Sequence, residues 1–160
     1  FDPDAPGTLT AADILDASYL PVTTPGTGWN ARTQQLGNVF IGASRDNLLN
    51  ALQSQQSNVW NYQFNWAQQP APWNDVYGAA HAFDLPFVFG NFGPSVFARA
   101  TNSTANQPGR LALSGVMMDS VRAFVHTGNP NHAGLGQEWQ PWPRKFIFDA
   151  DQKATRLSVQ

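Results

Sequence analysis

A strict alternation of aromatic and amide side chains between Val59 and Ala67 constrains the fold more than any other part of the sequence. Four aromatic residues take every second position, with amides between them: Trp60, Asn61, Tyr62, Gln63, Phe64, Asn65 and Trp66. Because successive side chains of a β-strand point to opposite faces, this pattern predicts a strand with one aromatic face. We expect an inner strand of a mixed sheet, with the four aromatic side chains largely buried.

Helices are expected in three other places. The apolar residues of 111–128 recur at helical spacing, and Gly128 marks the end of that helix. A short helix is expected after the capping box Thr10–Asp13, ending near residue 20. Another is expected to begin at Ser44, which is followed by an apolar stripe.

The C-terminal residues predict a hairpin. Residues 145–159 contain two short strand-like segments with a turn expected near Asp151. One strand and one hairpin make a small sheet, and so few strands rarely close a stable core alone. The sequence therefore indicates a portion of a larger sheet.

The composition excludes several classes of function. With a net charge of −2, the chain lacks the basic excess typical of nucleic-acid binding. It contains no run of about 18 apolar residues, so we expect no segment that spans a membrane. The chain has no cysteine, which excludes disulfides and thiolate metal sites. This does not fix the compartment; we expect an extracellular or periplasmic location. Only 12% of residues are charged, against about 25% in average domains, which favours packing against another polypeptide.

His81 is the strongest catalytic candidate among the three histidines. It follows the aromatic strand, and functional groups of open α/β sheets gather beyond the carboxyl ends of strands. A hydrogen-bonded structural histidine is the alternative. His126 falls late in a predicted helix, where a cation suits the C-terminus, and His132 is expected in an exposed loop. The three lack the spacing of metal ligands, so we expect no metal site.

No serine in the chain is a credible nucleophile. None of the nine lies in the Gly-x-Ser-x-Gly turn that presents the nucleophile of many hydrolases. Ser95 follows a proline that would stiffen a turn that must be sharp, and Ser114 falls inside a predicted helix. The residues alone therefore offer a candidate base without a candidate nucleophile.

Several motifs in a fixed order carry a resemblance to a known family. Residues 78–90 have the pattern Gly-Ala-x-His, two residues, an acid, Leu-Pro, one residue and Val-Phe-Gly. The aromatic strand precedes them, Phe124–Asn131 has the form Phe-x-x-Thr-Gly-Asn-Pro-Asn, and a Trp-Pro pair follows at Trp142. Over about residues 36–159, the chain resembles the type-B carboxylesterases, which include cholinesterases and bacterial para-nitrobenzyl esterases.

The resemblance implies an α/β fold in which residues 1–160 are the C-terminal part of one α/β-hydrolase catalytic domain. It implies a carboxylic-ester hydrolase working by serine acyl transfer, with His81 as the triad histidine and no cofactor. In this family the nucleophilic serine and the triad acid lie upstream. We therefore expect them on an N-terminal chain of the same esterase, which would act with this chain on a small ester.

The resemblance also implies roles for residues around His81. Asp84 matches an acid that is structural in the family. Four aromatic residues are expected to line part of the substrate gorge, with core packing as the alternative: Trp73, Phe83, Phe87 and Phe89.

Two other functions stay open from the sequence. The first is a catalytically inactive cholinesterase-like module for binding or adhesion, which would keep the fold without a working serine. The second is a carbohydrate-binding module that stacks sugars on Trp60, Trp66 and Trp73. The second requires these three rings to be exposed and coplanar.

Overall fold

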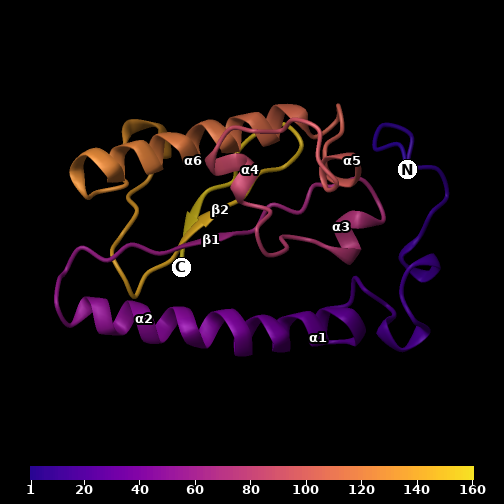
Figure 1. Cartoon of the computed structure of the whole chain (residues 1–160), viewed down its shortest axis with the longest axis horizontal. Helices are drawn as coiled ribbons and strands as arrows, with labels where there is room; N and C mark the ends of the chain where they lie inside the picture. The colour runs from indigo at the N-terminus through magenta and orange to yellow at the C-terminus, as the bar shows by residue number, and fades with distance from the viewer.

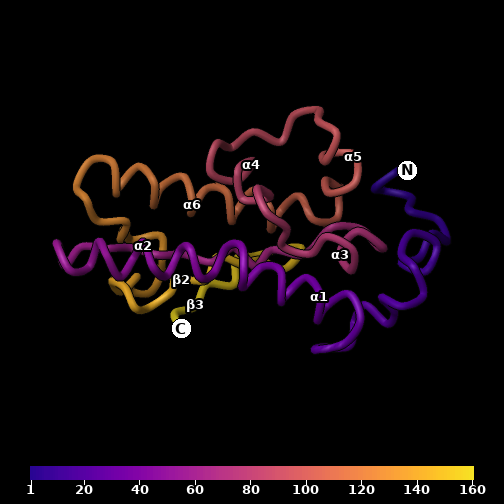
Figure 2. The backbone as a smooth tube through the Cα atoms, turned by 60° about the horizontal axis from the view of Figure 1, so that its bottom comes forward, coloured from indigo at the N-terminus to yellow at the C-terminus, as the bar shows by residue number.

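The computed structural model describes residues 1–160 and places a small sheet between two long helical segments (Figure 1). On one side lies α6 (Gln107–Thr127). On the other side α1 (Gly28–Gly37) and α2 (Ala43–Gln53) run end to end, joined by a π-helical turn at Asn38–Gly42. Figure 2, turned to bring this side forward, shows α2 passing in front of the strands.

The sheet consists of β1 (Tyr62–Phe64), β2 (Phe146–Phe148) and β3 (Ser158–Val159), in that order. β1 is parallel to β2, and β2 is antiparallel to β3, so the sheet is mixed, as predicted. The predicted hairpin is also confirmed. In its turn, the carboxylate of Asp151 accepts the backbone N–H groups of Lys153 and Ala154.

The aromatic segment 59–67 differs from the prediction of an inner strand with four buried rings. Only three of its residues form the ladder, and β1 lies at the edge of the sheet because the chain has no further strand to pair with it. Trp66 is buried, Trp60 is half-buried, and Tyr62 is 37% exposed. The prediction is therefore wrong for this chain, and the open edge explains the exposure of Tyr62.

The helix predicted at 111–128 is confirmed as α6, with an earlier start. It begins at Gln107, because Pro108 is compatible with a first helical turn. Its last carbonyls are capped at Gly128, whose φ is 73° and whose N–H donates to the carbonyl of Phe124 (2.7 Å). The indole N–H of Trp60 donates to the carbonyl of Gly128 (2.9 Å), which ties this helix end to the segment before β1.

The first twenty residues contain less helix than predicted. The carboxylate of Asp13 accepts hydrogen bonds from the backbone N–H and the hydroxyl of Thr10, as expected of a capping box. Only two single 3₁₀ turns follow, Ala11–Asp13 and Ala17–Tyr19. The second turn is separate from the first and has its own N-cap, Asp16, whose carboxylate accepts the N–H of Ser18.

The next segment contains more helix than predicted. α1 was not expected, since its residues show no apolar stripe, and none of them is buried in the structure. Because α1 continues through the π-helical turn into α2, Ser44 lies inside a helix instead of starting one. None of the helices has both the length and the apolar character needed to cross a membrane.

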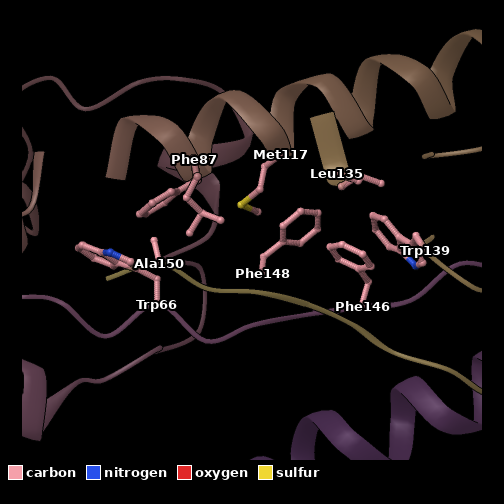
Figure 3. Packing of buried hydrophobic residues seen from close by; sticks show 9 residues of the cluster. Trp66, Phe87, Met117, Leu135, Trp139, Phe146, Phe148 and Ala150 are labelled. Carbon is pink, nitrogen blue, oxygen red and sulfur yellow. The ribbon is translucent and has the colours of Figure 1, made fainter. Parts of the chain in front are cut away.

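The core lies between α6 and the sheet (Figure 3). Its centre is β2, where Phe146 and Phe148 are almost completely buried, and Trp139 stacks on Phe146 with ring centroids 5.0 Å apart. Burying one such side chain stabilises a fold by about 1.5–3 kcal/mol. The cluster contains nine buried residues: Trp66, Phe87, Leu113, Met117, Leu135, Trp139, Phe146, Phe148 and Ala150.

Candidate active site

His81 lies in the turn between α3 (Trp73–Val76) and α4 (Leu85–Val88), downstream of β1. Its side chain is exposed. Its ring makes no hydrogen bond within the chain, since both hydrogen bonds to histidine rings belong to His132. The structure thus places His81 in a turn after the strand, with its imidazole accessible to groups outside the chain.

Two hydrogen bonds hold the backbone that leads to His81. Gln69 is 4% exposed, and its side-chain N–H donates to the carbonyl of Gly78 (2.7 Å). The indole N–H of Trp29, in α1, donates to the carbonyl of Val76 (2.8 Å). The backbone of 76–78, just before His81, is therefore held by Gln69 and by Trp29.

Asp84, three residues after His81, is bound to the sheet. The phenol O–H of Tyr62 donates to its carboxylate, with the two oxygens 2.6 Å apart. Partial burial raises the pKa of Tyr62 above its ordinary value of 10.0, and the hydrogen bond and charge of Asp84 raise it further. Tyr62 therefore keeps its proton at neutral pH and remains a donor.

Ala82 takes an unusual backbone conformation beside His81. Its φ is 68°, and it is the only residue other than glycine with a positive φ. For an L-residue this left-handed conformation costs on the order of 1–3 kcal/mol, and such residues cluster at functional sites. The turn leaves His81 exposed and Phe83 buried.

The four aromatic residues predicted to line a gorge do not form one surface. Trp73 stacks on Tyr77 with centroids 5.2 Å apart, and Phe83 meets the ring of Tyr77 at 5.7 Å. Phe87 is 2% exposed and belongs to the core, whereas Phe89 is 73% exposed. Tyr77, which joins Trp73 to Phe83, was not among the predicted residues, because a lone exposed tyrosine gives no pattern.

Two cavities lie near these residues. The smaller has a volume of about 70 Å³ and is lined by Phe83 and Phe87, among others. The larger, of about 190 Å³, lies between α6 and the aromatic segment and is lined mainly by Trp60, Tyr62, Met117, Val121, Phe124 and Trp139. Pockets for small-molecule ligands usually measure about 300–1,000 Å³. Neither cavity is therefore a complete substrate site.

His132 forms a serine–histidine pair that was not predicted. Its Nε2 lies 3.1 Å from Oγ of buried Ser120, and its Nδ1 accepts the N–H of Gly134 (3.2 Å). Because Nδ1 is an acceptor, a neutral ring carries its proton on Nε2 and donates to Ser120. A base that activates serine needs an unprotonated ring nitrogen that accepts the hydrogen bond from the serine hydroxyl. His132 is thus half-buried and structural, which corrects its prediction as an exposed loop residue.

The three tryptophans proposed as a sugar platform are not exposed together. Trp66 is 1% exposed and packs against Phe87 in the core, and Trp60 and Trp73 are half-buried. The structure therefore excludes the exposed coplanar surface that the carbohydrate-binding alternative requires.

Sequence comparison identifies one family. Residues 19–158 match the description "Carboxylesterase family". The para-nitrobenzyl esterase of Bacillus subtilis (strain 168) is 35% identical over 92 residues, which are 57% of this chain and 16% of that protein. The chain thus spans only a small part of the length of this relative.

Solved structures give the same result for the fold. A carboxylesterase of Geobacillus stearothermophilus superposes with a TM-score of 0.61 at 23% identity, over 92% of this chain and 28% of its own. An esterase of Clostridium hathewayi that hydrolyses aliphatic aromatic polyesters gives 0.53 at 26% identity, over 76% of this chain and 22% of its own. These neighbours confirm the predicted fold class, a portion of an α/β-hydrolase with a mixed sheet.

Proposed function

The chain belongs to the carboxylesterase family, and we propose that it contributes the catalytic histidine, His81, to an enzyme that hydrolyses carboxylic esters. The nucleophilic serine and the acidic member of the triad would come from a second polypeptide, the N-terminal chain of the same esterase. A small ester would be the substrate, and no cofactor is needed for this chemistry.

In this reaction the imidazole of His81 moves a proton in two directions. It takes the proton of the serine hydroxyl as the oxygen attacks the ester carbonyl, and then gives it to the departing alcohol. Water repeats the sequence to release the carboxylic acid. The carboxylate of the second polypeptide would bind the other ring nitrogen and fix the tautomer.

The contrast between a held backbone and an accessible ring supports this role. The turn is anchored through Gly78 and Asp84, whereas the imidazole of His81 is exposed and makes no hydrogen bond within the chain. A structural histidine usually resembles His132, whose two ring nitrogens both have partners. Both nitrogens of a triad histidine need partners as well, and for His81 these would lie on the second polypeptide.

The open edge of β1 supports a second polypeptide. The ladder to β2 uses the carbonyl of Asn61 and the N–H of Asn65. Because backbone groups along a strand alternate in direction, those of Tyr62 and Phe64 face the other edge. A strand from the N-terminal chain could pair there, as exposed edges favour.

Replacement of His81 by alanine in the complete esterase tests the proposal. We expect kcat for a nitrophenyl ester to fall by about 10³-fold or more, since loss of a triad member leaves only binding and oxyanion stabilisation. His126→Ala is the matched control, because His126 is also exposed and is expected to leave kcat unchanged. A His81→Ala enzyme as active as this control would reject the catalytic role of His81, whereas a complete parent protein without any esterase activity would favour the inactive binding module.

A second experiment tests the division of the active site. We expect residues 1–160 alone to hydrolyse no nitrophenyl ester above the buffer rate. Mixing with the N-terminal polypeptide should restore activity, and a denaturing gel of the active fraction should show both bands. Activity of the 160-residue chain alone would contradict the need for a partner.

A further inference from the structure

The hydrogen bond between Tyr62 and Asp84 links the sheet to the turn that carries His81. Tyr62 is the first residue of β1 and lies opposite Phe146 in the ladder with β2. Its phenol oxygen is 2.6 Å from the carboxylate of Asp84. Distances of about 2.5–2.7 Å are typical of charge-assisted O–H···O⁻ bonds, which are roughly twice as strong as neutral ones.

The ring of Tyr62 is fixed independently of this bond. It packs edge-on against Phe148 and Trp139, with centroids 5.6 and 6.2 Å away. Both partners belong to the core cluster. The hydroxyl therefore presents its proton from a fixed position, and Asp84 is bound to a rigid support.

The turn needs such a support because its backbone is strained. The positive φ of Ala82 persists only where the surroundings determine the conformation. Phe83 provides one restraint, since it is buried against Tyr77 and Phe97. Asp84 provides the other through Tyr62.

We propose that Tyr62 is a positioning residue, which holds the imidazole of His81 in its reactive geometry through Asp84. This inference rests on the proposed role of His81. A general base has to lie within about 2.6–3.2 Å of the proton that it takes. A displacement of about 1 Å costs about 10²-fold in rate. Tyr62 acts on the position of the base through its hydrogen bond to Asp84.

The test is Tyr62→Phe in the complete esterase, which removes the hydroxyl and keeps the packed ring. We expect kcat to fall about tenfold or more while KM stays within about twofold, because the base is displaced and the substrate site is not. The melting temperature should stay close to that of the parent. Tyr19→Phe is the control, because Tyr19 is half-buried in the 3₁₀ turn Ala17–Tyr19 and its hydroxyl makes no hydrogen bond.

Variants of Asp84 show whether the two residues act together. Asp84→Ala should lose as much kcat as Tyr62→Phe, and the double variant should lose no more than either alone. Asp84→Asn keeps an acceptor oxygen and should recover part of kcat. Additive losses, or a rise in KM with kcat unchanged, would overturn the inference.

The outcomes separate this inference from the proposed function. If His81→Ala is inactive and Tyr62→Phe has the kcat of Tyr19→Phe, only the role of Tyr62 fails. If His81→Ala keeps its activity, the catalytic role of His81 fails, and the role of Tyr62 fails with it.

Discussion

The sheet half of the chain, residues 59–160, builds a buried apolar core, whereas the helical segment, residues 28–53, leaves most of its large apolar side chains exposed. All nine residues of the core cluster belong to the sheet half. The helical segment buries only Leu49. Its exposed apolar residues are Leu36, Val39, Phe40, Ile41, Leu48 and Leu52.

The difference shows which part of the fold this chain stabilises by itself. Most helical stability in proteins comes from packing of an apolar face and little from propensity. The sheet half has that packing between α6 and β2. The helical segment lacks it, so we expect its apolar residues to be covered in the complete esterase.

The largest expected effect is on the sheet half. Phe146→Ala should lower the free energy of unfolding of the chain by about 3–5 kcal/mol, since it removes a fully buried ring from the core. Phe40→Ala, in the helical segment, should change it by less than about 0.5 kcal/mol, because Phe40 is 68% exposed. Urea unfolding followed by tryptophan fluorescence measures both. Equal losses of unfolding free energy in the two variants would mean that the sheet half and the helical segment do not differ in how packing stabilises them.

The second prediction concerns Phe40 in the complete esterase. If the N-terminal polypeptide covers the helical segment, Phe40→Ala should cost about 2–4 kcal/mol there, although it costs little in the isolated chain. The measurement is the change in melting temperature that Phe40→Ala causes in the complete esterase and in the isolated chain. The same small cost in both would show that Phe40 stays in solvent.

The third prediction compares two histidines of the sheet half. His132→Ala should destabilise the chain by about 1–3 kcal/mol, because it leaves the buried hydroxyl of Ser120 without its partner. His126→Ala should have almost no effect, since His126 is exposed and late in α6. Urea unfolding at pH 7 distinguishes them, and a neutral His132→Ala would contradict the pairing with Ser120.

The elements that could be predicted from sequence are those with strong local signals. α6 has a helical period and a glycine stop, and the hairpin has a turn residue whose carboxylate binds the turn backbone. The position of β1 at an edge could not be predicted, because the number of strands paired with it depends on the whole sheet. α1 could not be predicted either, because it has no apolar stripe and buries no residue.

The candidate site shows the same limit. His81 was found through a motif of neighbouring residues. The bond from Tyr62 to Asp84 spans 22 residues, and that from His132 to Ser120 spans 12. No local pattern indicates either pair. Trp73 and Phe83 were expected to line the substrate gorge from the family resemblance. Their contact through Tyr77 depends on the fold of the turn.

The smallest expected effect concerns the attachment of the helical segment to the sheet half. Two hydrogen bonds join α2 to Trp142: the indole N–H donates to the side-chain oxygen of Asn50 (2.9 Å), and the carbonyl accepts from Gln53 (2.7 Å). Both lie near the surface. We expect Asn50→Ala to cost about 0.5–1.5 kcal/mol. The loss should be local, because the core of the sheet half makes no use of this bond.

Hydrogen exchange is the suitable measurement, because it resolves local opening that global unfolding averages. In Asn50→Ala, amides of 43–53 should exchange up to about tenfold faster, while those of 146–148 keep their rates. Asn47→Ala is the matched control, since Asn47 is exposed on the same helix and its side chain makes no hydrogen bond. Faster exchange in β2 as well would mean that the two regions unfold as one unit. Equal exchange in the two variants would mean that Trp142 does not hold the helical segment in solution.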